Sequence, residues 1–256
     1  MSFDQLLHVA KLGAVPHHLL VHEWHEKRQH LAVYTEDLPR LVDEYRASEK
    51  GPYDRNPKIT LVDPYPKIRL SSACEAASNC LYGMAEIAAQ FANKVSGGAL
   101  PSSFNAFRKN VEDGRYDGLV PSWVVKDLSW YKKVRELRTE WSHFSTVFVG
   151  ENQDGTPIIV VRCSRRISDR VEFPKEIHVK VSDLVDWIQR AIVTIDNLGD
   201  FALVKYVIPK LDRNAILTSP KRDENGWPII RDDSTFEVEK ITVAEHLAQC
   251  GIRISE

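Results

Sequence analysis

The stretch that decides the fold is SDLVDWIQRAIVTIDNLGDFALVKYVIP, residues 182–209. Apolar side chains recur in it every three or four residues, which is the period of an amphipathic α-helix. Ser182 and Asp183 are favourable first residues of a helix, and Pro209 marks its expected end. About seven turns of helix then carry one apolar stripe that has to be buried against other helices. The stripe comprises Leu184, Ile188, Ile192, Ile195, Leu198, Ala202 and Tyr206.

Three earlier segments are also expected to form long helices, which gives a bundle of four main helices. The first runs from about residue 17 to 47, and Pro39 is expected to kink or divide it. The second runs from about 70 to 94 and is rich in small residues, so a neighbouring helix can approach it closely. The third is expected after Pro121 and ends at about Ser142.

The segments between these helices carry turn and strand signals. Residues 50–67 are rich in proline and are expected to form a loop. Residues 102–111 are expected to form a short helix capped by Ser102. At about 145–163 the apolar period changes from 3.6 to 2 around a turn, which predicts a β-hairpin. Residues 177–181 are expected to add a short strand.

The predicted architecture is therefore mainly α, with a β-hairpin at about 145–163 inserted between the third and fourth main helices. Residues 1–212 are expected to form the helical domain. After Asp212 the composition becomes polar and turn-rich, so residues 213–256 are interpreted as a C-terminal appendage. A last short helix is expected at 242–249 within it.

The composition bounds the class of protein. The chain has 256 residues and a net charge of −2, which argues against a uniformly basic nucleic-acid binder but leaves room for a local basic patch. No apolar run approaches the length of a membrane span, and residues 1–15 lack the features of a signal peptide, so a cytoplasmic protein without a membrane partner is expected. The four cysteines form no CxxC motif and are expected to be reduced thiols, the alternative being a disulfide or a metal site.

One motif in the third main helix carries candidate chemistry. The segment Arg138-Thr139-Glu140-Trp141-Ser142-His143 ends this helix. On a helical wheel Arg138 falls in the middle of an apolar face, and His143 falls at its edge. A guanidinium on such a face is costly unless it is paired or opens into a cleft. The sequence leaves two alternatives, which are an ion pair with a carboxylate such as Asp196 and a site that binds an anion.

The order of elements around this motif resembles the HEPN superfamily. These are helical bundles whose signature is an arginine, four to six residues and a histidine, and the resemblance covers about residues 17–210. It implies that residues 1–212 form a HEPN-like domain that is a metal-independent endoribonuclease without a cofactor, acting as a toxin or defence effector. It also implies a homodimer, an RNA substrate and an antitoxin or other regulatory protein as partner. The alternative is a non-catalytic HEPN module that binds a nucleotide or a protein.

The resemblance also assigns roles to the residues of the motif. Arg138 would hold the scissile phosphate and His143 would transfer protons, while Thr139, Glu140 and Ser142 would orient them. The residue after the arginine is often Asn, Asp or His in the family, and here it is a threonine. Cleavage through the 2′-OH needs a proton acceptor and a proton donor on opposite sides of phosphorus. Two copies of the motif across a dimer axis would supply both, so the interface is expected to include the third and fourth main helices.

The surroundings of the motif are basic. Residues 126–170 hold nine basic and six acidic side chains, a net of +3 within a chain of −2. Such a segment can grip a phosphodiester backbone, and aromatic rings can stack on bases. The alternatives are a solvated charged face and aromatic side chains packed in the core. The residues expected to bind RNA are Lys132, Lys133, Arg135, Trp141, Arg165 and Arg166.

A second cluster of candidate ligands lies in the first main helix. His18, His22 and His25 share one helical face, a spacing that can bind Zn²⁺ or Ni²⁺. No HExxH motif and no second group of ligands accompanies them. The preferred interpretation is therefore that no metal is bound and that these histidines form a polar face.

Overall fold

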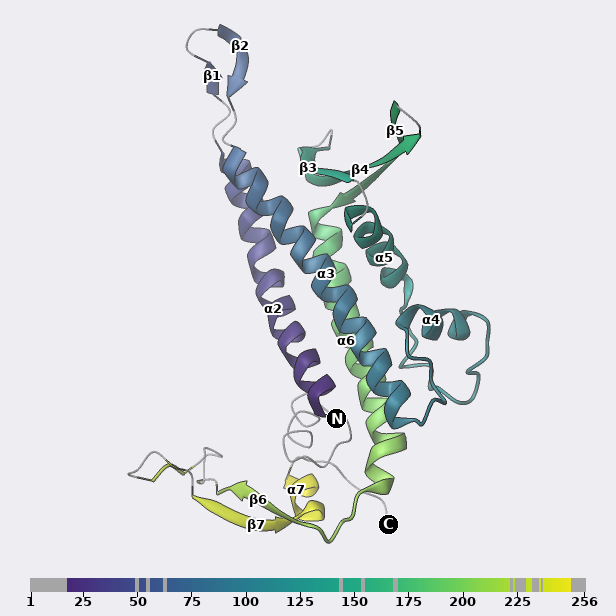
Figure 1. Ribbon diagram of the computed structural model, residues 1–256. Coiled ribbons are helices and arrows are strands. Elements are labelled where there is room, and N and C mark those ends of the chain that lie inside the picture. The colour runs from purple at the N-terminus through teal and green to yellow at the C-terminus, as the bar shows by residue number, and fades with distance from the viewer. Residues whose placement is uncertain are drawn as a thin grey trace.

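The structure is a computed structural model that is mainly helical, with a small antiparallel sheet at one end of the long helices (Figure 1). The residues that it describes are 18–48, 51–53, 56–61, 64–142, 145–152, 155–167, 170–221, 223, 229–231, 235 and 237–249.

Four long helices form the body of the molecule, as the apolar periodicity predicts. They are α2 (His18–Ala47), α3 (Pro64–Val95), α5 (Ser129–Ser142) and α6 (Val181–Ala202). Helix α3 contacts the other three, and α6 also packs against α2 (Figure 1). The apolar faces of these helices meet in one buried core. Among the described residues, no helix is both long enough and apolar enough to cross a membrane.

Three differences from the sequence prediction involve prolines. Helix α2 runs through Pro39 without division, and this proline is exposed on the helix surface. The region predicted as a loop forms a short antiparallel hairpin of β1 (Gly51–Tyr53) and β2 (Asn56–Leu61). Helix α3 then begins at Pro64 rather than near Leu70, because a proline at the first helical position loses no hydrogen bond.

Helix α5 starts later than predicted. The chain leaves α4 (Phe104–Glu112) and reaches α5 at Ser129 through a segment of turns, in which the apolar Val124 and Leu128 are buried. Helix α4 is preceded by Ser103 at its N-cap rather than by Ser102.

Side chains of α6 and of the π-helical turn that follows it (Leu203–Val207) hold residues 119–127 in this non-helical path. Three of them donate hydrogen bonds to backbone carbonyl oxygens of this segment, which competes with helical hydrogen bonding. The bonds run from Thr194 to Asp127 (3.1 Å), from Asn197 to Trp123 (3.2 Å) and from Lys205 to Leu119 (3.1 Å).

The predicted hairpin is part of a larger sheet. Strands β3 (Ser145–Glu151), β4 (Pro157–Ile167) and β5 (Arg170–Lys180) form an antiparallel sheet in the order β3-β4-β5. The third strand is longer than the short strand predicted at 177–181, and it leads directly into α6. Helix α5 contacts β3 and β4, so the C-terminal end of α5 lies at the sheet (Figure 1).

After α6 the helix continues as one π-helical turn and one 3-10 turn through Lys210. The C-terminal part contains the hairpin of β6 (Ile216–Pro220) and β7 (Val238–Thr242), followed by α7 (Val243–Gln249). Val243 and Leu247 of α7 are buried and belong to the same core as the long helices.

Candidate functional site

The Arg-x4-His motif lies at the junction of α5 and the sheet. Arg138 is half-buried, and its guanidinium carbon Cζ lies 4.9 Å from the centroid of the Tyr82 ring on α3. Thr139 is exposed. His143 lies outside the described residues, as do the side chains of Glu140 and Ser142. The structure therefore places the arginine of the motif and leaves the position of its histidine a prediction.

The ring under Arg138 belongs to a cluster that joins α3 to α5. Tyr82 stacks on Tyr131 of α5 with ring centroids 5.8 Å apart and an angle of 19° between the rings. The Tyr131 hydroxyl donates a hydrogen bond of 2.6 Å to Oε1 of Glu86, one turn after Tyr82 on α3. Burial and then the Glu86 carboxylate raise the pKa of Tyr131, so this phenol keeps its proton and remains a donor.

Asp196, which the sequence offers as a partner for Arg138, forms an ion pair with α2 instead. Nε of Arg28 lies 3.0 Å from Oδ2 of Asp196, and the pair joins α2 to α6. One contact of Arg138 is thus the face of an aromatic ring. A ring face attracts a cation through its quadrupole.

The predicted RNA-binding residues of α5 separate into two groups. Lys132, Lys133 and Arg135 are exposed, and Arg135 donates a hydrogen bond of 3.3 Å to the side-chain oxygen of Asn105 on α4. Trp141 is only 9% exposed and belongs to the core. Its ring is therefore packed against protein, which favours the core-packing alternative over stacking on a base.

Strand register changes the charge balance that the sequence indicates. Arg165 and Arg166 lie in β4, where their backbones are described and their side chains are not. Arg165 pairs in register with Glu172, and Arg162 pairs with Glu176. The basic segment 126–170 ends before these two glutamates, so β5 brings two acidic residues from outside that segment opposite arginines of β4.

The described histidines and cysteines form no cluster of three metal ligands. The side chain of His18 lies outside the described residues, while His22 and His25 are half-buried on α2. Cys74 and Cys80 on α3 are free thiols. Burial raises the pKa of the Cys74 thiol to about 12.

A long hollow runs between α6 and residues 121–127. It consists of two adjoining cavities of about 580 Å³ and 670 Å³, which share Trp123 and Asn197 in their walls. We call it the α6 groove. Three large apolar side chains along it reach solvent, with exposed fractions of 48% for Trp123, 60% for Val193 and 53% for Val204. Apolar side chains exposed along a groove are typical of a surface that binds protein.

An ion-pair network lies in the wall of this groove. Arg190 of α6 forms an ion pair of 3.1 Å with Asp127 and a second pair with Asp186. Asp127 also accepts hydrogen bonds from the amide nitrogen (3.2 Å) and the hydroxyl (2.7 Å) of Ser129, the first residue of α5. These interactions, the Ser129 hydroxyl first, lower the pKa of Asp127. The network fixes the start of α5 against α6.

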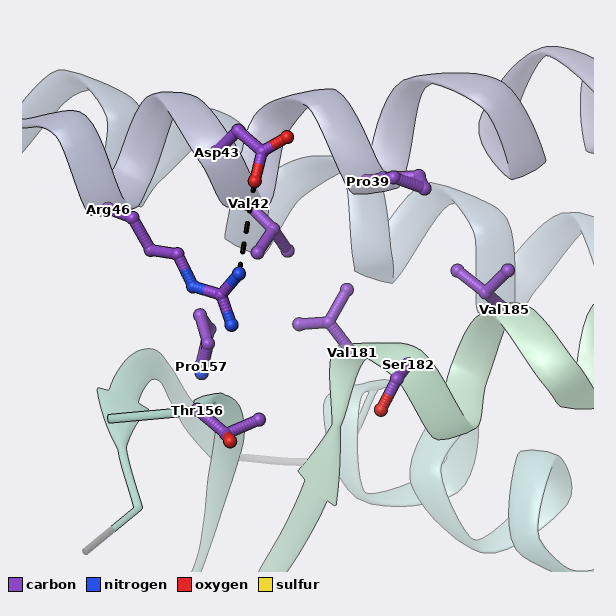
Figure 2. Close-up of a pocket in the computed structure, with 9 residues that line it drawn as sticks. All are labelled: Pro39, Val42, Asp43, Arg46, Thr156, Pro157, Val181, Ser182 and Val185. Atoms are coloured by element: carbon purple, nitrogen blue, oxygen red, sulfur yellow. Dashed lines mark ion pairs between the residues drawn. The ribbon is translucent and has the colours of Figure 1, made fainter. Parts of the chain in front are cut away.

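A smaller cavity of about 320 Å³ lies between α2, the β3–β4 turn and the start of α6 (Figure 2). Its walls are largely apolar, and Arg46 points across its mouth, 3.8 Å from Asp43. The elements that line it differ from those around Arg138. It is lined by Pro39, Val42, Asp43, Arg46, Thr156, Pro157, Val181, Ser182 and Val185.

Comparisons of the chain with protein-family models, with curated protein sequences and with solved structures gave no match. The function therefore has to be argued from the residues around Arg138. Sequence reasoning found Arg138 but missed Tyr82 and Glu86, which lie on another helix. Their only signal is an i, i+4 pair of polar side chains on α3, which is too common to indicate a site.

Proposed function

We propose that the protein is a metal-independent endoribonuclease of HEPN type that acts as a homodimer, a function that suits a toxin or defence effector. The observation that supports this best is the environment of Arg138. Its guanidinium is half-buried and lies over an aromatic ring, five residues before the histidine of the motif. A guanidinium held in this way is suited to binding a phosphate through its planar fork of donors.

The chemistry assigns one task to each residue of the motif. Arg138 stabilises the charge that develops on the phosphorane when the 2′-oxygen attacks phosphorus. His143 of one protomer takes the proton from the 2′-OH, and the same residue of the second protomer gives a proton to the leaving 5′-oxygen. Imidazole can do both near neutral pH because its ordinary pKa lies there. This reaction needs no metal ion.

The exposed lysines of α5 supply a means of binding the substrate. Lys132 and Lys133 lie on the same helix as Arg138 and reach solvent. Their charges can neutralise phosphates that flank the scissile bond, which would keep the RNA along α5.

The α6 groove supports the homodimer. Its acidic and basic side chains occur in equal number, with Asp127, Asp186 and Asp200 against Lys126, Arg190 and Lys205. A two-fold interface brings a surface against itself, so a balanced surface meets no net repulsion there. The groove also lies on α6 and on the segment that leads into α5, the two helices that the sequence predicts at the interface.

The same groove favours a second candidate function. An exposed apolar groove can hold a helix of another protein, which suits a non-catalytic HEPN module with a protein partner. The two candidates differ in solution, because the first predicts a dimer that cleaves RNA. The second predicts a monomer without this activity.

Cleavage of a mixed RNA substrate in EDTA tests the proposed function. The wild-type protein should cleave, and His143→Ala and Arg138→Ala should each reduce the rate by roughly 10²-fold or more, the scale of acid–base and charge stabilisation. Matched controls are His30→Ala and Arg40→Ala on the exposed face of α2, which should cleave like the wild type. Wild-type rates from a folded His143→Ala protein would contradict the proposal.

A further inference from the structure

The Tyr82 ring contacts two residues of α5 that are two helical turns apart. Tyr131 and Arg138 differ by seven residues, so they lie on one face about 10.5 Å apart along the axis. The Tyr82 centroid lies 5.8 Å from the Tyr131 centroid and 4.9 Å from Cζ of Arg138. The Tyr82 ring therefore contacts both side chains.

Tyr131, the first of these two α5 residues, packs in the aromatic core. Tyr131 is fully buried, and its ring centroid lies 4.8 Å from that of Phe104 at the start of α4. The 2.6 Å hydrogen bond from its hydroxyl to Glu86 fixes the rotation of the ring relative to α3. Tyr131 is thus held by contacts with two other helices, and Tyr82 is held against a ring that cannot move freely.

We propose that Tyr82 and, through Tyr131, Glu86 are positioning residues that hold the Arg138 guanidinium in a fixed orientation for the scissile phosphate. This inference rests on the proposed function for its catalytic consequence. The ring offers a flat surface to one face of the planar guanidinium, a contact that restricts how the group can turn. Because an arginine side chain otherwise samples many rotamers, the ring reduces the entropy lost when the phosphate binds.

The inference predicts a difference between two variants at Tyr82. Tyr82→Phe keeps the ring, so kcat in EDTA should stay within about threefold of the wild type. Tyr82→Leu removes the ring and should lower kcat by roughly tenfold or more, with a smaller change in KM, because orientation matters most in the transition state.

A matched control exists on the same helix. Arg69 lies over Tyr65 at 5.7 Å, near the other end of α3. Tyr65→Leu removes an equivalent arginine–tyrosine contact from an exposed ring and should leave kcat unchanged. Equal losses in the Tyr65→Leu and Tyr82→Leu variants would overturn the inference.

A nuclear magnetic resonance measurement tests the placement without any activity. Side-chain protons of Arg138 should be shifted upfield by the Tyr82 ring, and the shift should persist in Tyr82→Phe and vanish in Tyr82→Leu. An unchanged shift in Tyr82→Leu would overturn the inference. If the wild type cleaves no RNA, the proposed function fails alone, because this shift still decides whether Tyr82 holds Arg138.

A second variant covers the case in which Tyr82→Leu fails to fold. Tyr131→Phe keeps both rings and removes the hydroxyl that donates the hydrogen bond to Glu86. It should broaden the Arg138 resonances and lower kcat a fewfold, since the Tyr131 ring loses the bond that fixes its rotation relative to α3. Wild-type resonances and wild-type kcat in this variant would overturn the role of Glu86.

Discussion

Gly199 of α6 lies directly against the indole of Trp24 on α2. A Cβ atom at position 199 would come within 2.1 Å of Cη2 of Trp24, far inside van der Waals contact. Trp24 is fully buried, and its ring also meets Phe91 of α3 at 6.3 Å. The absence of a side chain at one position on α6 therefore allows α2 and α6 to approach closely at this point.

Gly199→Ala should destabilise the protein, because neither the α6 backbone nor the buried indole can move away without disturbing the core. We expect the free energy of unfolding to fall by at least roughly 1–3 kcal/mol, the usual cost of overpacking. Chemical denaturation followed by circular dichroism measures this change.

Gly83→Ala is the matched control for that prediction. Its added Cβ would meet only the flexible end of the Lys27 side chain, at 3.1 Å from Cε. Helix propensity then favours alanine by up to about 1 kcal/mol, so this variant should be as stable as the wild type or more stable. Equal destabilisation of both variants would contradict the role of Trp24.

Asp127→Ala should remove a link between the start of α5 and α6. The carboxylate accepts two hydrogen bonds from Ser129 and pairs with Arg190, so the variant should lose about 1 kcal/mol of stability at pH 7, the usual net value of an intramolecular hydrogen bond. Asp43→Ala is the control. Asp43 is 79% exposed and lies 3.8 Å from Arg46, so its loss should change stability by less than about 0.5 kcal/mol.

Asp127 should also make the free energy of unfolding depend on pH under acidic conditions. Its folded pKa lies below the ordinary value, so the carboxylate stabilises the folded state fully above the unfolded pKa of about 3.9. That stabilisation is lost as the pH falls through the lower folded pKa. The gap in unfolding free energy between wild type and Asp127→Ala should therefore narrow below about pH 4. A constant gap from pH 7 to pH 2 would contradict this account.

Cys74 should resist alkylation until the protein unfolds. The thiolate is the reactive form, and burial raises the pKa of this thiol to about 12. Iodoacetamide at pH 8 followed by peptide mass mapping should find Cys74 unmodified in the native protein and modified in denaturant. Cys80, which is half-buried and donates a hydrogen bond to the Lys27 carbonyl at 3.3 Å, should react faster in the native state. Native labelling of Cys74 at the rate of Cys80 would contradict the prediction.

Exposed lysines of α5 should set the salt dependence of RNA binding. If Lys132 and Lys133 each neutralise a phosphate, the double alanine variant should reduce the slope of log K against log salt by about 0.7 per lost contact. Filter binding from low to moderate salt measures the slope. Lys210 and Lys240 are exposed in the C-terminal part, and their double alanine variant is the control that should leave the slope unchanged. An unchanged slope in the α5 variant would place the RNA elsewhere.

Val193→Glu should dissociate the dimer. A carboxylate in the middle of the α6 groove would face its own copy across a two-fold axis, which combines like-charge repulsion with the cost of burying charge. Sedimentation at micromolar concentration should show a dimer for the wild type and a monomer for the variant. Val33→Glu on α2 adds the same charge at a similarly exposed residue outside the groove and should remain dimeric. A monomeric wild type would contradict the homodimer.

The long helices could be predicted because their period is repeated over many residues. The stripe on α6 identifies the correct segment, with Leu184, Ile188 and Leu198 all buried. The β1–β2 hairpin was missed because its prolines are turn signals in any single sequence, although Pro52 occupies a strand and pairs with Thr60. Local sequence patterns predict short strands poorly, because pairing with a neighbouring strand determines whether such a strand forms.

The candidate site was predictable only in part. Position on the helical wheel correctly places Arg138 on the inward side of α5, where it is half-buried. The cluster that holds it could not be found, because the Tyr131–Glu86 hydrogen bond joins residues 45 positions apart on different helices. Trp141 shows a second limit of sequence analysis. A single sequence does not distinguish an aromatic ring that packs in the core from an exposed ring that can stack on a base.

The attachment of residues 119–127 to α6 has a consequence for the order in which the chain folds. The three hydrogen bonds that hold this segment come from side chains 67, 74 and 86 residues further along the chain. During synthesis the segment leaves the ribosome well before its donors exist, so it cannot adopt its final path until α6 has emerged and docked. Docking of the start of α5 is thus a late event of folding. A ribosome stalled while it translates strands β3 to β5 would carry a nascent chain in which the α6 groove has not yet formed.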